Sequence, residues 1–280
     1  MKIFTKIRDI KAELGQVRAQ KKSIGFVPTM GALHQGHISL VERARKENGI
    51  VVTSIFVNPT QFNNPEDLKK YPRTWEKDLE MLKSAPNDIV FSPEVEEMYP
   101  AHEPEEHFDF KGLDMVMEGK FRPGHFQGVA RVVAKLFRIV EPDRVYFGEK
   151  DYQQLLIIRK ISEQLFPDIT IVACPTVREK DGLAMSSRNA LLDPTTRSEA
   201  LIIFQALLKA RELKNKMTVP ELKKMVEDKI NSSSTLRVEY FEIADENNLQ
   251  PLAEINQNAR AFIAVQAGKV RLIDNLSLNF

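Results

Sequence analysis

Two histidines stand three residues apart in the string Pro28-Thr-Met-Gly-Ala-Leu-His-Gln-Gly-His37. Each imidazole can donate a hydrogen bond to a phosphate oxygen and can carry a positive charge when protonated. Gly36 lets backbone and phosphate approach each other closely. A lone histidine more often caps a helix, but His34 and His37 together, with Gly31 and Gly36 around them, favour a nucleotide-phosphate site.

The elements around these histidines are a strand, a turn and a helix. The apolar run 24–27 predicts a buried strand, and Pro28, Gly31 and Gly36 then allow sharp turns. Apolar residues at helical spacing follow on a charged background and predict an amphipathic helix: Ile38, Leu40, Val41 and Ala44. We expect free backbone N–H groups of the turn, and the positive end of the helix dipole, to face an anion.

The next strand completes a β-α-β unit. Residues 50–57 form a near-continuous β-branched run, which is typical of a parallel strand covered on both faces. The sequence therefore predicts an α/β fold with a Rossmann-like doubly wound parallel sheet, whose ligands lie at the carboxyl ends of the strands. The amide-rich loop 58–65 comes at such an end; a small-molecule site around Gln61 and an ordinary Asn/Pro turn are both open interpretations.

A second phosphate-facing turn follows the predicted strand 144–147. Gly148 permits close approach, and Lys150 supplies a point charge for a phosphate. Asp151 is a candidate Mg²⁺ ligand, directly or through water, because Mg²⁺ prefers oxygen and keeps several waters. A Glu-Lys-Asp triplet is more often solvated charge. The hypothesis of a phosphate-facing turn therefore depends on the position of the triplet after a buried strand.

Two further segments place donors before helices. Ser186 and Ser187 precede Arg188, whose guanidinium can bridge phosphate oxygens in a fork geometry; a turn that caps the next helix is the alternative. Arg122 and His125 precede the strongly periodic helix predicted over 129–140, where an anion-facing role and surface capping remain equally open.

Composition narrows the class of protein. The 280 residues have a formal net charge of +1, so no overall basic excess indicates nucleic acid or an anionic membrane as partner. The single cysteine, Cys174, lies in an apolar run and is expected to be a buried structural thiol. No signal-peptide core and no run of membrane-spanning length is apparent, so we expect a cytoplasmic chain.

The motifs together resemble one family. The string 28–37 is similar to the nucleotide-binding signature of pantothenate synthetase (pantoate–β-alanine ligase), within the nucleotidylyltransferase and class I aminoacyl-tRNA synthetase superfamily. Further similar blocks cover residues 55–62 with 71–74, 119–128, 148–154, 185–189 and 271–275. Arg188 matches this family and differs from the Lys-Met-Ser-Lys-Ser usual in the superfamily. The resemblance extends from about residue 3 to residue 276.

The resemblance implies an ATP- and Mg²⁺-dependent ligase that joins (R)-pantoate to β-alanine through a pantoyl adenylate. It implies catalytic roles for His37, His34, Lys150 and Arg188, pantoate and β-alanine binding by Gln61 and Gln154, and Asp151 as metal ligand. The implied ATP-binding residues are Met30, Gly31, Ala32, Leu33, His34, Gln35, Gly36, His37, Gly148, Glu149, Lys150, Asp151, Val177, Met185, Ser186, Ser187 and Arg188. For His37, a general-acid role and charge stabilisation both stay open.

We expect two domains. Residues 1–186 are the predicted ATP- and pantoate-binding domain, and residues 187–280 a C-terminal α+β lid. The lid is predicted to contain helices over 195–214 and 218–231, a polar linker at 232–235, and strands over 236–243, 259–266 and 270–273. A closing lid would shield the adenylate from water. The family resemblance also implies a homodimer.

Three other functions use similar motifs. A nucleotidylyltransferase would need extra cations for a phosphate-bearing acceptor, where this chain has Gln61 and the pair Gln153-Gln154. A tRNA-charging enzyme needs a basic RNA-binding surface, which the charge balance disfavours. A non-catalytic nucleotide-binding module would have no use for the amide-rich loop.

Overall fold

The computed structural model describes residues 1–101 and 104–279. The chain forms two compact units, of which the first comprises residues 1–149 and 154–175 and the second residues 150–153 and 176–280. The sequence-based prediction places the domain boundary after Ser186. The segment Thr176–Ser186 therefore groups with the second unit, as does the short insert Lys150–Gln153.

The first unit is built on a parallel sheet. Its described strands run in the order β1-β4-β3-β2-β5-β6 and all pair in parallel, which confirms the predicted doubly wound α/β class. The strands are β1 Lys2–Phe4, β2 Ile24–Thr29, β3 Ile50–Ile55, β4 Ile89–Phe91, β5 Arg144–Gly148 and β6 Thr170–Cys174. Strand order reverses between β2 and β5, and in such folds the crevice at that point binds ligands.

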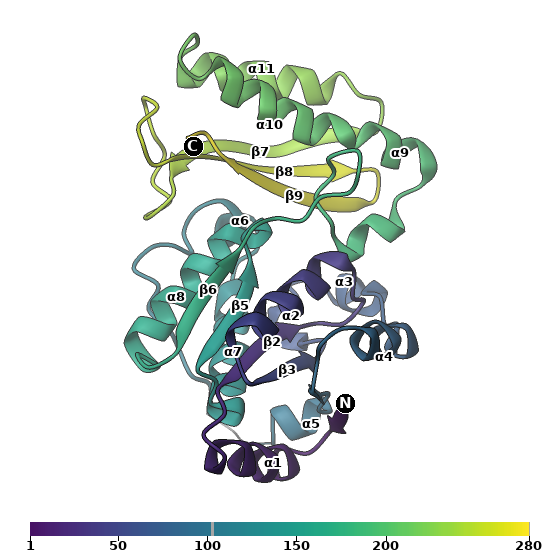
Figure 1. Ribbon diagram of the computed structural model, residues 1–280. Helices are drawn as coiled ribbons and strands as arrows, with labels where there is room; N and C mark the ends of the chain where they lie inside the picture. The colour runs from purple at the N-terminus through teal and green to yellow at the C-terminus, as the bar shows by residue number, and fades with distance from the viewer. Residues whose placement is uncertain (102–103, 280) are drawn as a thin grey trace. The chain divides into compact units, whose positions relative to one another are not determined.

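Helices connect these strands (Figure 1), and apolar residues fix which side of each helix is buried. On one face α2 and α4 pack with β2, β3 and β5 into a cluster that includes Val41, Leu82 and Tyr146. Helix α7 buries twelve of its sixteen residues, whereas Arg131, Lys135 and Arg138 recur at helical spacing and are half-buried or exposed. Helix α1 packs against α7. The helices are α1 Ile7–Ala19, α2 Gln35–Glu47, α3 Pro65–Lys70, α4 Trp75–Ser84, α5 Val95–Met98, α6 Met117–Phe121, α7 His125–Val140 and α8 Tyr152–Leu165, with short 3₁₀ turns η1 Pro59–Gln61 and η2 Glu149–Asp151.

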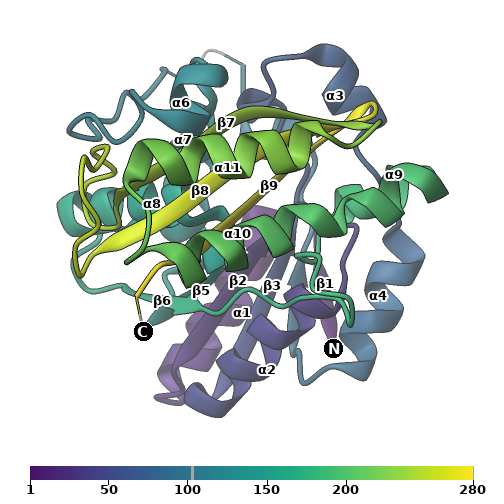
Figure 2. The same cartoon turned by 90° about the horizontal axis from the view of Figure 1, so that it is seen from above.

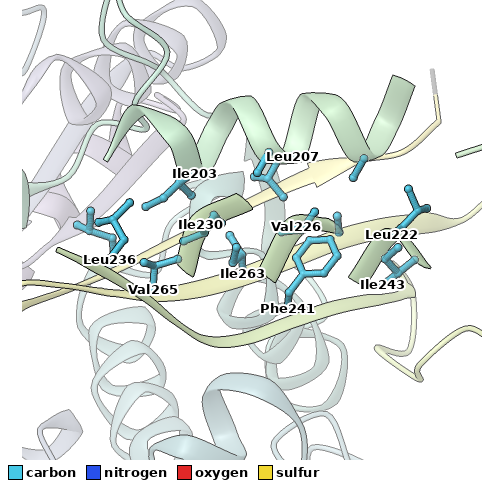
Figure 3. Packing of buried hydrophobic residues seen from close by; sticks show 14 of the residues in the cluster. Ile203, Leu207, Leu222, Val226, Ile230, Leu236, Phe241, Ile243, Ile263 and Val265 are labelled. Carbon is cyan, nitrogen blue, oxygen red and sulfur yellow. The ribbon is translucent and has the colours of Figure 1, made fainter. Parts of the chain in front are cut away.

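The second unit is a helix-on-sheet layer. An antiparallel sheet has strand order β7-β8-β9, and α10 and α11 lie across one of its faces (Figure 2). Ile203 and Leu207 of α10 meet Val226 of α11 and Phe241 of β7 in its core (Figure 3). The elements are η3 Ser187–Leu191, α9 Pro194–Glu199, α10 Leu201–Leu213, α11 Val219–Asn231, β7 Leu236–Asp245, β8 Ala259–Ala267 and β9 Val270–Ser277. The predicted small α+β unit is therefore confirmed.

Three local predictions differ from the structure. The helix predicted over 195–214 is two helices, α9 and α10, which meet at Ala200. The polar, proline-interrupted sequence around residues 92–107 predicts a loop with two surface histidines, but the segment contains α5 at Val95–Met98. His107 is exposed, and His102 lies outside the described residues. The polar linker at 232–235 is a fixed turn, because the Glu199 carboxylate accepts hydrogen bonds from Ser233, Ser234 and Thr235.

Candidate active site

The histidine pair lies where β2 ends and α2 begins. Gly31 has φ +79° and Ala32 has φ +48°, so two successive residues adopt left-handed backbone after the strand. A side chain at position 31 is strained by that φ, and its Cβ would lie 3.1 Å from Asp78 Oδ2. His34 is the N-cap of α2, and its ring centroid is 4.1 Å from that of His37. The predicted strand–turn–helix arrangement is present.

The expectation that free backbone N–H groups line this turn is wrong for four of its amides. Ala32 N and Leu33 N donate to the two carboxylate oxygens of Asp78 at 2.9 and 2.8 Å. His34 N donates to His37 Nδ1 and Gly36 N to His34 Nδ1, both at 3.2 Å. The loop satisfies these amides internally, so anion contacts here depend more on side chains than we expected.

Sequence reasoning missed Asp78. Its carboxylate is 1% exposed and also accepts a hydrogen bond from Thr74 Oγ1 at 3.0 Å, at the start of α4. A buried carboxylate with several donors holds the turn that carries the histidines. Nothing in the local pattern of α4 marks Asp78 among its other charged residues, because its partners lie far away in the sequence.

The hydrogen bonds assign the tautomer of both histidines. Each Nδ1 accepts from a backbone N–H, so in the neutral ring the proton is on Nε2. This reciprocal capping gives the Nδ1 of each ring a structural task at the start of α2.

The amide loop contacts the histidine loop within the first unit. Gln61 is 8% exposed, its Oε1 accepts from Asn58 Nδ2 at 3.1 Å, and its Nε2 approaches Met30 Sδ at 3.0 Å. Asn58 is held in turn by the Tyr99 hydroxyl, which donates to Asn58 Oδ1 at 2.9 Å. Because Oε1 is occupied, the Gln61 amide presents its NH₂ as the donor for a substrate oxygen.

His125 supports this loop and does not cap the surface. It is 5% exposed, its Nδ1 lies 2.8 Å from Gln61 O, and its Nε2 lies 3.1 Å from Arg122 Nη1. Because a guanidinium only donates, Nε2 is the acceptor and Nδ1–H donates to the Gln61 carbonyl. Gly128 closes the contact, since a Cβ there would lie 2.2 Å from Thr60 O.

The serine–arginine segment belongs to the second unit and is carried by a hairpin. Glu179 N donates to Leu183 O at 2.8 Å, and Met185 N to Val177 O at 3.0 Å. The Ser186 hydroxyl accepts from Arg188 N at 3.2 Å and caps η3. The segment therefore forms the helix-capping turn that the sequence offered as the alternative. The same hydroxyl keeps a proton that it can donate.

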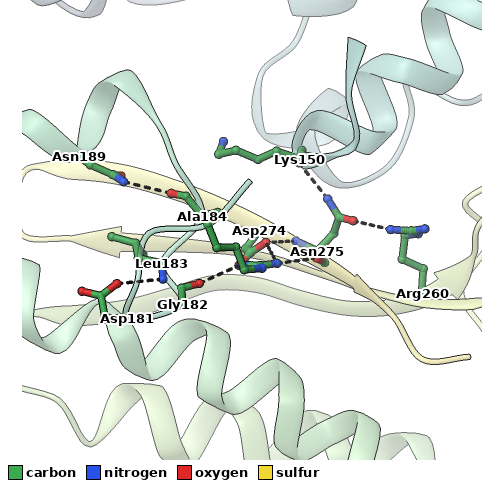
Figure 4. Close-up of polar contacts among 10 residues, drawn as sticks. Lys150, Asp181, Gly182, Leu183, Ala184, Asn189, Arg260, Asp274 and Asn275 are labelled. Carbon is green, nitrogen blue, oxygen red and sulfur yellow. Dashed lines mark hydrogen bonds and ion pairs between the residues drawn. The ribbon is translucent and has the colours of Figure 1, made fainter. Parts of the chain in front are cut away.

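Lys150 lies with this segment in the second unit. Lys150, Ser186, Asn189 and Asp274 line one small pocket. The Lys150 carbonyl accepts from Asn275 Nδ2 at 2.9 Å (Figure 4). The Nζ of Lys150 is 3.9 Å from Asp151 Oδ2. The structure therefore brings two of the predicted anion-binding groups together.

The remaining predicted residues have simpler surroundings. Gln154 lies in the first turn of α8, is half-buried and groups with the first unit. Among the described residues, no three His, Cys, Asp or Glu side chains gather as a protein metal site would require, and Asp151 is about half exposed.

Cys174 is buried, as predicted, and burial raises the pKa of its thiol to about 11. Within the part of the chain that the structure describes, no helix has both the length and the apolar character needed to cross a bilayer.

Comparisons with known proteins agree over the whole length of the chain. Residues 2–277 match the family model described as Pantoate-beta-alanine ligase. A protein named pantothenate synthetase from Bacteroides thetaiotaomicron is 52% identical over 278 residues, which are 99% of this chain and 98% of that protein. Its counterpart from Bacteroides fragilis is 53% identical over the same share of each chain.

Solved structures give the same answer. The pantothenate synthetase of Thermus thermophilus has a TM-score of 0.94 and 44% identity and covers 100% of both chains. The pantoate-beta-alanine ligase of Francisella tularensis, complexed with beta-gamma ATP and beta-alanine, has a TM-score of 0.85 and 38% identity and covers 99% of this chain and 98% of its own. With sequence, fold and motifs in agreement, this chain belongs to the pantoate–β-alanine ligase family.

Proposed function

We propose that this chain condenses (R)-pantoate with β-alanine at the expense of ATP and releases pantothenate, AMP and diphosphate. One observation carries the proposal: the chain matches over its full length a relative crystallised with beta-gamma ATP and beta-alanine. The histidine loop, the amide loop and the serine–arginine segment each carry donors that an ATP-dependent acyl activation could use.

Each compact unit supplies its own ATP ligands in this proposal. In the first unit, His34 and His37 donate through Nε2–H, and Met30–Leu33, Gln35, Gly36, Gly148 and Glu149 shape the nucleotide site. In the second unit, Lys150 and Arg188 supply positive charge and Ser186 and Ser187 supply hydroxyl donors, next to Asp151, Val177 and Met185. Grouping by compact unit supports this division, because Lys150 and Ser186 line one pocket.

The reaction has two steps. The pantoate carboxylate attacks the α-phosphorus in line, a new phosphorus–oxygen bond forms, and the bond to the departing diphosphate breaks. Charge develops on phosphate oxygens, so positioned donors and cations provide most of the acceleration. The β-alanine amine then attacks the acyl carbon of pantoyl adenylate and displaces AMP. No side chain becomes covalently bound to substrate.

Gln61 and Gln154 are the proposed substrate amides. The NH₂ group of Gln61 suits a carboxylate or hydroxyl oxygen of pantoate, because Asn58 already occupies its carbonyl oxygen. Its contact with Met30 places this donor beside the histidine loop. A neutral amide also fits a hydroxy acid better than the phosphate-bearing acceptor of a nucleotidylyltransferase.

Mg²⁺ enters this proposal as part of the nucleotide substrate. The donor set fits that role: Asp151 is the one predicted protein ligand, its carboxylate is about half exposed, and Mg²⁺ binds readily through phosphate oxygens, waters and one carboxylate. Bound there, Mg²⁺ would neutralise triphosphate charge. We also propose a homodimer, as the family resemblance implies, and a cytoplasmic location, where ATP is supplied.

Pyrophosphate exchange tests the function. The protein is incubated with ATP, Mg²⁺, labelled diphosphate and one acceptor at a time: pantoate, a phosphate ester or an amino acid. We expect label in ATP with pantoate alone, and release of AMP once β-alanine is added. Exchange with a phosphate ester or an amino acid, and none with pantoate, would indicate a nucleotidylyltransferase or an amino-acid-activating enzyme and refute the proposal.

A further inference from the structure

Two adjacent residues of strand β9, Asp274 and Asn275, hold the two anion-binding groups of the second unit. Both are buried, with 5% and 4% exposure. Successive side chains of a strand point to opposite faces, so neighbours can hold two different segments. Asp274 holds the hairpin that leads to Ser186, and Asn275 holds the turn that contains Lys150.

Asp274 acts through Arg178. The guanidinium donates to Asp274 Oδ2 at 2.7 Å and to Oδ1 at 3.0 Å, and also to Gly182 O at 3.2 Å. It stacks on Phe204, with its Cζ 3.7 Å from the ring centroid. A paired, planar contact of this kind fixes direction as well as distance. Arg178 and Gly182 belong to the hairpin before Ser186, so its register is tied to β9.

Asn275 holds the turn that contains Lys150. Its Nδ2 donates to Lys150 O at 2.9 Å, and its Oδ1 accepts from Arg260 Nη1 at 2.7 Å (Figure 4). The same Arg260 lies over the Tyr152 ring, with its Cζ 3.9 Å from the centroid. Arg260 thereby fixes the amide orientation and packs against the residue two places after Lys150. This explains why Lys150–Gln153 groups with the second unit.

We propose that Asp274 and Asn275 are positioning residues, which hold Ser186–Arg188 and Lys150 in one fixed mutual arrangement for the triphosphate. The inference rests on the proposed ATP-binding roles of Lys150 and Arg188. The proposed role does not require either β9 residue to touch substrate. Their contribution is preorganisation: the cation and the hydroxyl donors keep their geometry before ATP arrives.

A crossed mutant cycle tests the proposal in the full-length protein. Asn275→Asp keeps the acceptor for Arg260 and removes the donor to Lys150, whereas Gln266→Ala removes an exposed side chain from neighbouring β8 and serves as the control. Asn275→Asp and Gln266→Ala are each made in three backgrounds: the unchanged protein, the Lys150→Ala variant and the Arg188→Ala variant. Pantoate-dependent exchange gives kcat and the KM for ATP, and thermal unfolding reports stability.

We expect Asn275→Asp to lower the exchange kcat by about 10- to 100-fold, with little change in the KM for ATP. In Lys150→Ala the same change should cost less than about twofold, whereas in Arg188→Ala it should keep most of its effect. Gln266→Ala should match the unchanged protein. If Asn275→Asp does not fold, Asn275→Ser takes its place in the cycle.

Two outcomes would overturn the positioning role: a normal exchange rate in the folded Asn275 variant, or an equal loss in both backgrounds, which indicates general damage to the unit. A different result tests the proposed ATP-binding role of Lys150, on which the inference rests. If Lys150→Ala itself exchanges at a normal rate, the proposed role of Lys150 fails, whatever Asn275 does.

Discussion

The proposed function gives the two nitrogens of His37 separate tasks. Nδ1 accepts a hydrogen bond from His34 N, which closes the cap of α2, and Nε2–H is the donor that we propose for the triphosphate. An asparagine amide can reproduce the position of Nδ1, and a glutamine amide that of Nε2. The two substitutions therefore test the assignment in opposite directions.

We expect His37→Asn to preserve the thermal midpoint and to lower the adenylation rate by about 10²–10³-fold, as loss of one transition-state donor does elsewhere. His37→Gln should retain more of the rate and lose some stability, because the cap acceptor is gone. Single-turnover adenylate formation and thermal unfolding measure the two effects. A faster rate in His37→Asn than in His37→Gln would show that Nδ1 is the functional nitrogen.

At this scale, residue type and spacing carry much of the information. The pair His34 and His37 is visible because histidines and glycines recur after a strand. Asp78 is not visible, and Asn275 is visible only as the end of the similar block 271–275, since a buried polar residue looks like any other until its distant partner is known. Asp78 accepts from the amides of Ala32 and Leu33, and the two histidine rings accept from those of His34 and Gly36, so the sequence alone overstates the free backbone donors.

Among the elements, the turn 232–235 between α11 and β7 depends on a single carboxylate. Glu199, at the end of α9, accepts from the hydroxyls of Ser233, Ser234 and Thr235. These bonds lower the pKa of Glu199 to about 2, with the Ser233 hydroxyl the largest cause. The turn therefore stabilises the second unit more strongly while Glu199 is ionised.

The sign of the pH dependence follows from that lowered pKa. The contribution of ionised Glu199 to stability is fully present at a pH above the ordinary glutamate pKa. It is lost as the pH falls from about 4.5 toward 2. Glu199→Gln should lower the thermal midpoint by a few degrees at pH 7, and the difference should shrink across that window. The exposed Glu227→Gln on α11 is the control. A difference that stays constant down to pH 2 would contradict the role of the charge.

Elements with a clear apolar period could be predicted, such as β2, β3 and α7. Strand β1 has three residues and pairs only with the distant β4, so no local pattern indicates it. The break at Ala200 is equally hidden, because no proline or glycine marks it and Glu199 is bound to a turn far along the chain.

For the whole molecule, the division into two compact units decides how ATP should act. Each unit has its own apolar core, and each holds part of the proposed donor set. A ligand that bound one unit alone would stabilise that unit alone. A ligand that needs donors from both units binds only when both are folded. Its binding free energy is therefore lost when either unit unfolds, and this couples the stabilities of the two units.

Hydrogen exchange measured peptide by peptide distinguishes these cases. At ATP and Mg²⁺ concentrations about 100 times Kd, binding is worth about 2.7 kcal/mol, so protection should rise in peptides covering 30–41 and in peptides covering 176–191. In Lys150→Ala, at the same nucleotide concentration, protection should weaken in both sets. Pantoate without ATP is the control and should protect the region around Gln61 only. Protection by ATP confined to one unit, with the other exchanging as in the free protein, would mean that the two donor groups do not share a nucleotide.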